Sequence, residues 1–118
     1  MKTKNVILDK TYKFALRIVK LYKYLCEEKK EYVLSKQVLR SGTSIGANSE
    51  EGSAGQSKAD FISKFSIALK EAKETHYWIR LFRDSDLLEL KLAESLIKDC
   101  DEIIAIITSI LKSAREKN

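Results

Sequence analysis

Few residues in this chain could do chemistry, and their spacing matches no known metal-binding pattern. The sequence has one histidine and two cysteines. A di-iron centre in a helical bundle needs two Glu-x-x-His pairs, because the metals require several carboxylates and imidazoles. Here the residue three positions after Glu74 is Tyr77. His76 is therefore interpreted as a packed or half-exposed helix residue, and we expect no metal and no other cofactor.

Patterns for nucleophilic catalysis and phosphate binding are not found either. Cys26 and Cys100 lack the CxxC spacing and lie on apolar stripes, without a nearby charge that would lower the pKa of a thiol. Both are predicted to be small core residues. The segment 42–46, Gly-Thr-Ser-Ile-Gly, lacks the Gly-Lys-Ser/Thr ending of a phosphate loop.

Two carboxylates on one predicted helix could act as an acid–base pair. Glu71 and Glu74 stand beside Lys70 and Lys73, however, which favours a solvated or ion-paired helix face. We therefore expect a protein that is not an enzyme.

One row of basic residues points to a ligand. Four cations follow one another at spacings of 3, 4 and 3 and share one face of a helix: Lys10, Lys13, Arg17 and Lys20. Tyr24 extends this face by one turn and could stack on a base. The net charge is +5, and residues 1–30 hold nine Lys and Arg against three acids. The row is interpreted as a nucleic-acid-binding surface, and the alternative is a solvated helix face.

Composition predicts one all-α domain over residues 1–118. The 118 residues include no proline, four glycines, 44% apolar residues and 33% charged residues, a balance that favours long helices. The basic start lacks a small-residue cleavage site, and no apolar run approaches the roughly 18 residues of a membrane span. We expect a cytoplasmic protein that does not associate with membranes.

Apolar residues at spacings of 4 and 3 predict three helices, over about 6–28, 57–84 and 88–115. The predicted core faces are Leu8, Tyr12, Ala15, Val19, Tyr22 and Cys26 in the first helix, Phe61, Phe65, Ala68, Ala72, Thr75, Ile79 and Phe82 in the next, and Ala93, Leu96, Cys100, Ile103, Ile107, Ile110 and Ala114 in the last. Ser57 is the predicted N-cap of the helix over 57–84.

The segment over about 33–53 allows two interpretations. Gly42, Gly46 and Gly52 each weaken a helix by roughly 1 kcal/mol relative to alanine, which favours a loop. Helical spacing nevertheless persists at Leu34, Val38, Ser41, Ile45 and Asn48. A stripe of mostly small residues runs beside it: Leu39, Gly42, Gly46 and Ser49. We predict a helix against which another helix packs closely.

Four helices with short connections, near 29–33, 53–57 and 84–88, predict an antiparallel up-down-up-down four-helix bundle. Two features stay open. Arg40, Asn48 and Glu51 form either a buried polar network or part of the surface. Trp78 is either a second-seam core residue or an exposed aromatic at a partner interface, and we favour the interface.

The central part of the chain carries a recognisable combination of residues: Arg40-Ser41, Ser44-Ile45, Asn48, Glu51-Gly52, Ser57, Asp60-Phe61, Ile67 to Ala72, Glu74-Thr75 and Tyr77-Trp78. It resembles the four-helix-bundle family of proteins encoded in intervening sequences of bacterial 23S ribosomal RNA genes. Many relatives read Asn-Ile-Ala-Glu-Gly where residues 48–52 read Asn-Ser-Glu-Glu-Gly, so this turn is more polar here. The residues that match the structural motif are Arg40, Ser44, Asn48, Glu51, Gly52, Asp60 and Phe61.

The resemblance implies a bundle that often forms a ring of five subunits and has no established enzymatic activity. The chain is also similar to the accessory protein of diversity-generating retroelements, a basic pentamer that binds a reverse transcriptase and nucleic acid. We therefore expect an oligomeric nucleic-acid-binding protein, with RNA preferred, that uses the basic row at 10–24. The alternative is an oligomeric adaptor or accessory factor that binds another protein and no nucleic acid.

Overall fold

Four helices make up most of the chain in the computed structural model, which describes residues 2–116. They are α1 (Lys2–Glu27), α2 (Leu34–Ser53), α3 (Lys58–Asp84) and α4 (Leu90–Glu116). The predicted bounds agree to within a few residues, and the largest difference is the earlier start of α1. The glycine-containing segment is a helix and not a loop, as predicted.

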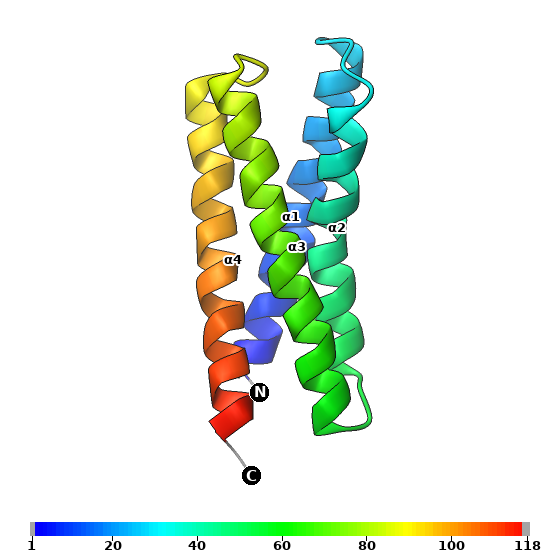
Figure 1. Ribbon diagram of the computed structural model, residues 1–118, viewed down its shortest axis with the longest axis vertical. Coiled ribbons are helices and arrows are strands. Elements are labelled where there is room, and N and C mark those ends of the chain that lie inside the picture. Colours follow the sequence, from blue (N-terminus) through cyan, green and yellow to red (C-terminus); the bar gives the residue numbers. More distant parts are fainter. Residues whose placement is uncertain (1, 117–118) are drawn as a thin grey trace.

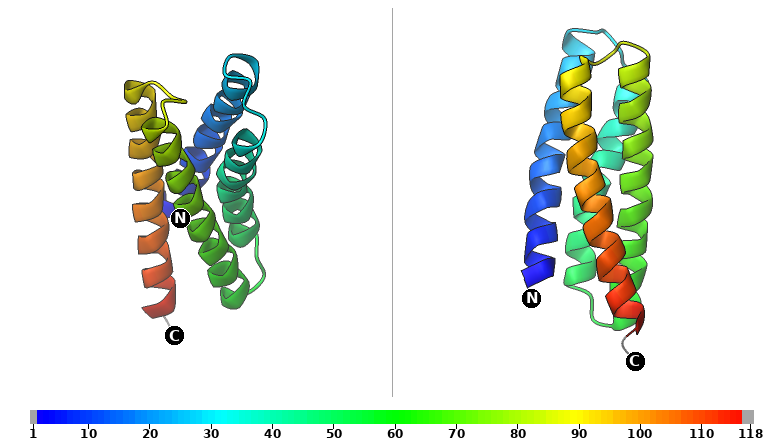
Figure 2. Two further views of the ribbon diagram at one scale, coloured as in Figure 1. Left: turned by 45° about the horizontal axis from the view of Figure 1, so that its top comes forward. Right: turned by 90° about the vertical axis from the view of Figure 1, so that its left-hand side faces the viewer.

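The helices form an up-down-up-down bundle (Figure 1), elongated to 49 × 21 × 19 Å. Among the described residues, each helix packs against two neighbours: α1 and α3 both contact α2 and α4, and the backbones of the diagonal pairs do not approach within 8 Å between Cα atoms. The contact between α1 and α4 is the least extensive, and Figure 2 shows these helices from two further sides. Within residues 2–116, no helix combines the length and hydropathy that crossing a membrane requires.

Local sequence explains where the helices begin and end. The Ser57 hydroxyl accepts a hydrogen bond from the Asp60 backbone N–H at 3.0 Å. Ser57 is therefore the N-cap of α3, as predicted. The chain leaves α1 and α3 through residues with positive φ, Lys30 and Asp86. At each exit a backbone N–H reaches back six residues to a helix carbonyl, which ends the helix.

A carboxylate caps the start of α2. Glu31 accepts hydrogen bonds from the backbone N–H groups of Val33, Leu34 and Ser35, at 3.1, 2.9 and 2.7 Å. Partial burial acts to raise the pKa of Glu31, but these hydrogen bonds outweigh it, and the pKa is lowered below the ordinary value. The ionised carboxylate therefore satisfies amide groups that the helix itself leaves without acceptors.

The buried face of α1 is shifted by one position along the sequence from the predicted face. The buried residues are Ile7, Thr11, Phe14, Ile18, Leu21 and Leu25, whereas the predicted row lies half-buried or, at Tyr12, 61% exposed. Both rows have the same spacing of 4 and 3, so periodicity alone does not distinguish them. The row with the larger aliphatic side chains and Phe14 is the one buried, which keeps the two tyrosine hydroxyls of the other row nearer water.

The predicted core faces of α3 and α4 are confirmed. Every residue of these two rows is buried except Phe61 and Ala114, which lie half-buried at the ends of the bundle. Cys100 is fully buried, as predicted, but Cys26 is half-buried beside α2 rather than in the core.

The stripe of small residues on α2 is where α1 approaches most closely. A Cβ atom at Gly42 would lie 2.7 Å from Ile18 Cγ1, and one at Gly46 would lie 3.3 Å from Thr11 Cβ. Gly52 faces α3 instead, where a Cβ atom would lie 3.0 Å from Lys64 and Phe65. The glycines of α2 therefore allow close contact with α1 and with α3. The stripe of small residues predicted one such close contact, and the structure has it with α1.

We expect Gly46→Leu to lower the free energy of unfolding by about 1–3 kcal/mol, because the added atoms overpack the contact with Thr11. Ala47→Leu is the matched control, since Ala47 is the next residue of α2 and is exposed. Its unfolding free energy should stay within about 0.5 kcal/mol of the wild type. Denaturant melts measure both, and equal stability of the Gly46→Leu variant and the wild type would contradict the close approach.

Candidate functional site

The basic row of α1 lies against α4. Lys10 Nζ is 3.3 Å from Glu102 Oε1, and Arg17 Nη1 is 2.6 Å from Asp99 Oδ2. Lys13 Nζ is 3.0 Å from Asp9 Oδ2, one turn earlier on α1. The cations share a face as their spacing predicted, but these three have carboxylate partners.

The other two residues of this row differ from each other. Lys20 is exposed and has no ion-pair partner among the described residues. Tyr24 is half-buried and packs against the core, so much of its ring is not available to a base. In the part of the row that faces α4, positive and negative charges nearly cancel.

A shallow groove of about 140 Å³ runs between α1 and α4 along this row. Phe14 and Ile103 form its floor, and its polar lining is mixed in sign: Lys10, Lys13, Asp99 and Glu102. A polyanion entering the groove would meet carboxylates as well as ammonium groups, so the groove does not favour phosphate over other ligands.

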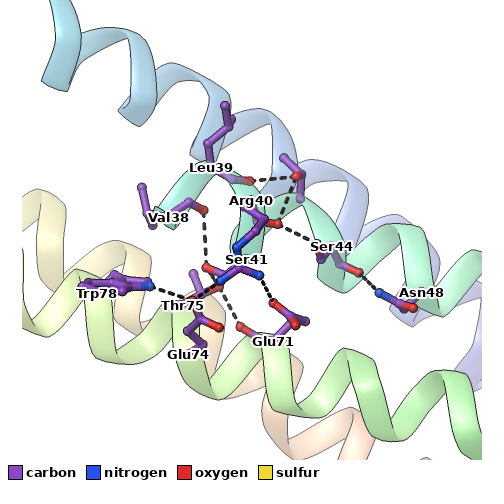
Figure 3. A network of polar contacts seen from close by, with 11 residues as sticks. Val38, Leu39, Arg40, Ser41, Ser44, Asn48, Glu71, Glu74, Thr75 and Trp78 are labelled. Carbon is purple, nitrogen blue, oxygen red and sulfur yellow. Dashed lines mark hydrogen bonds and ion pairs between the residues drawn. The ribbon is translucent and has the colours of Figure 1, made fainter. Parts of the chain in front are cut away.

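A second polar cluster joins α2 to α3 (Figure 3). Arg40 Nη1 donates to Glu71 Oε1 at 3.0 Å, and Arg40 Nη2 donates to Glu74 Oε2. The same Glu74 oxygen accepts from Trp78 Nε1 at 3.0 Å. Glu71 is only 8% exposed, so Arg40 supplies the charge that makes its burial tolerable.

Beneath this cluster, two buried hydroxyls meet across the same helices. Ser41 Oγ and Thr75 Oγ1 are 2.8 Å apart, and Thr75 Oγ1 is also 2.8 Å from the Glu71 carbonyl oxygen. Both side chains are fully buried. The α2–α3 seam is therefore polar as well as apolar, and the hydroxyls of Ser41 and Thr75 are hydrogen-bonded there.

Arg40, Asn48 and Glu51 make contacts of three different kinds. Arg40 belongs to the cluster that joins α2 to α3. Asn48 donates to the Ser44 carbonyl within α2 at 2.8 Å, and Glu51 forms a separate ion pair with Lys64 at 2.9 Å. The three residues do not form one network.

The other motif residues also lie along or near the α2–α3 connection. The Ser44 hydroxyl donates to the Arg40 carbonyl at 2.6 Å, Gly52 faces Phe65, and the ring of Phe61 lies 4.7 Å from that of Phe65. The Asp60 Cβ lies 3.1 Å from the position of a Cβ on Gly55, in the turn between these helices. Arg40, Glu51 and Gly52 therefore connect α2 to α3, whereas Ser44 and Asn48 form their hydrogen bonds within α2.

The remaining candidates for chemistry are held in structural contacts. His76 Nδ1 accepts from Arg80 Nε at 3.0 Å, and His76 Nε2 lies 2.9 Å from Asp101 Oδ1, so the ring bridges α3 and α4. Burial, together with the charges of Asp101 and Asp99, raises the pKa of Cys100 to about 12. That thiol stays protonated near neutral pH, and its Sγ donates to the Ala72 carbonyl at 3.2 Å.

Trp78 is half-buried against the core, which supports the second-seam interpretation. Its neighbour Tyr77 is the exposed aromatic, and the two rings meet edge to face at 5.2 Å.

A row on the outer face of α3 was not identified from the sequence. It consists of Lys70, Lys73, Tyr77 and Arg80, all exposed, and we call it the α3 row. Its spacing of 3, 4 and 3 is the same signal that identified the α1 row. The sequence predicts a solvated or ion-paired face for Glu71, Glu74 and the adjacent lysines, and the structure pairs both glutamates with Arg40.

The fold and its α2–α3 seam define an all-α bundle held by a polar signature between its second and third helices. The chain belongs to the family of 23S rRNA-intervening sequence proteins, whose family model matches residues 3–109. It is similar to a crystal structure of a protein of unknown function from the S23 ribosomal protein family of Bacteroides thetaiotaomicron VPI-5482. The two are 52% identical, with a TM-score of 0.91 over 93% of this chain and 98% of the other. A comparison with curated proteins finds no match.

We expect Arg40→Ala to lower the free energy of unfolding by about 1–3 kcal/mol, because it leaves the carboxylate of Glu71 buried without its partner. Adding Glu71→Gln should recover part of that loss. Lys13→Ala, which breaks an exposed ion pair with Asp9, is the control and should cost no more than about 0.5 kcal/mol. Urea unfolding measures these free energies. Equal decreases in the Arg40 and Lys13 variants would show that Arg40 stabilises the protein no more than an exposed ion pair does.

Proposed function

We propose that this protein is a non-enzymatic homo-oligomer that binds nucleic acid, with RNA preferred. The observation that carries the proposal is the pairing of charges. Many of the acids are held in ion pairs or as a helix cap, whereas exposed cations on several helices have no ion-pair partner among the described residues, including Lys20, Lys23, Lys70, Lys73 and Lys98. With a net charge of +5, a surface of this kind attracts the phosphate backbone.

The α1 row contributes to this surface mainly through Lys20. Lys10, Lys13 and Arg17 contribute by exchanging their carboxylate partners for phosphate. The carboxylates of Glu102, Asp9 and Asp99 would stay beside a bound phosphate and repel it, so these three cations contribute less than Lys20.

Oligomerisation rests on the apolar row of α1 that the monomer core leaves uncovered. Tyr12 is 61% exposed and Leu16 is 50% exposed, and Leu8, Ala15 and Val19 beside them are half-buried. Exposed and half-buried apolar side chains grouped on one helix face are suited to a subunit contact. We propose that copies of this chain cover one another's α1 row, with five subunits preferred because of the family resemblance.

For assembly, we expect light scattering at micromolar concentration to give a mass several times that of the monomer, near five subunits. Leu16→Glu should reduce that mass, because a charge in an apolar contact must be desolvated. Leu90→Glu is the control, since Leu90 is also exposed but lies at the start of α4. A monomer mass for the wild type would refute the oligomer.

For binding, we expect the purified protein to retain single-stranded RNA at low salt and to lose affinity steeply as salt rises. Fluorescence anisotropy with a labelled oligonucleotide measures this, with the DNA oligonucleotide of the same sequence for comparison. Lack of retention of both RNA and DNA at low salt would reject the nucleic-acid proposal and leave the adaptor in its place.

A further inference from the structure

The outer face of α3 carries two lysines that no described carboxylate contacts, and Arg80, whose charge acts on Asp84 one turn later without an ion pair between them. Lys70, Lys73 and Arg80 have no ion-pair partner among residues 2–116. They lie along one side of the helix together with Tyr77, over ten residues, or about 15 Å of helix. The α1 row has the same spacing but contains three ion-paired cations, so the two rows differ in their effective charge.

The carboxylates nearest to the α3 row are occupied elsewhere. Glu71 and Glu74, which alternate with the lysines along α3, point to Arg40 on α2. Asp84 pairs with Arg83, and Asp101 of α4 contacts His76. Arg40 balances only one of the charges of Glu71 and Glu74, but both carboxylates contact α2, so Lys70 and Lys73 stand on the outer face without a carboxylate of the described residues in contact.

The aromatic ring in this row is exposed and held in place. Tyr77 is 51% exposed. Its ring centroid lies 5.2 Å from the ring centroid of Trp78, in a T-shaped arrangement, and 5.8 Å from Cζ of Arg80. Trp78 is in turn fixed by its hydrogen bond to Glu74. An exposed ring between cations is the arrangement that single-strand binders use, with stacking for the base and cations for the phosphates.

The position of α3 in the bundle keeps the row accessible in an assembly. Helix α3 lies diagonally opposite α1, because both pack against α2 and α4 and not against each other. If copies associate through the apolar row of α1, each α3 row faces away from that contact. A ring then repeats the row in every subunit, which multiplies a weak affinity for one long strand.

We propose that the α3 row is the principal contact surface for single-stranded RNA, with Lys70, Lys73 and Arg80 on successive phosphates and Tyr77 stacked on a base. This inference rests on the proposed function and assigns its main surface to α3 rather than α1. The ligand class follows from the combination of an exposed aromatic ring with exposed cations that form no ion pair within residues 2–116, since an acidic protein surface would not require the ring.

The test compares charge changes of equal size on the two helices. We expect Lys70→Glu with Lys73→Glu to weaken binding of a labelled oligouridine about tenfold or more and to flatten its salt dependence, because two phosphate contacts are lost. The matched control is Lys20→Glu with Lys23→Glu, two exposed lysines of α1 without ion-pair partners among the described residues, which should weaken binding about threefold or less. Circular dichroism and light scattering check that both variants keep their helix content and mass, and Lys70→Gln with Lys73→Gln replaces the first variant if it misfolds.

A second variant separates stacking from charge. Tyr77→Leu should weaken binding about fivefold or more while leaving the slope of affinity against salt unchanged, because stacking is not electrostatic. Equal losses in the α1 and α3 charge variants would mean that net charge alone drives binding, and a larger loss in the α1 variant would place the contact on α1. Either result overturns this inference while the proposed function stands, whereas a wild type that binds no oligouridine and no other oligonucleotide rejects the proposed function itself.

Discussion

The close approach of α1 and α2 sets the rotation of α1 about its axis, and much of the surface follows from that rotation. No side chain stands at Gly42 and Gly46, so Ile18 and Thr11 come directly against the backbone of α2. This contact turns the row that includes Phe14 into the core. It leaves Tyr12 and Leu16 uncovered and places the basic row beside α4, where the carboxylates meet it.

The ion pairs between α2 and α3 determine which charged side chains of α3 face solvent. Arg40 draws the carboxylates of Glu71 and Glu74 toward α2, and Trp78 follows Glu74. Lys70 and Lys73, which alternate with these acids in the sequence, are left without them on the outer face. A structural ion-pair cluster therefore determines where positive charge remains available for a ligand. The family motif and the proposed binding surface are physically connected in this way, although they lie on different sides of the helix.

The candidate site was only partly predictable from the sequence, and the α1 row shows why. Its spacing correctly placed Lys10, Lys13, Arg17 and Lys20 on one helix, because helical neighbours three and four residues apart share a face. Their partners were not visible, since Arg17 and Asp99 are 82 residues apart in the chain. The α3 row has equal spacing, but the sequence does not distinguish it from an ion-paired face, because Glu71 and Glu74 are adjacent to its lysines and pair with Arg40 only across the seam.

The sequence by itself determined the fold class, four helices close to their observed bounds, the family, and the close packing against the small residues of α2. These properties depend on local periodicity, helix capping and side-chain size, all of which the sequence contains. The tertiary structure alone decided which of the two apolar rows of α1 is buried and which cations keep a free charge. Two rows with identical spacing satisfy the same local rule, so the choice between them depends on the shape of the helix packed against them. Ion pairs between helices depend in the same way on rotations that no single segment specifies.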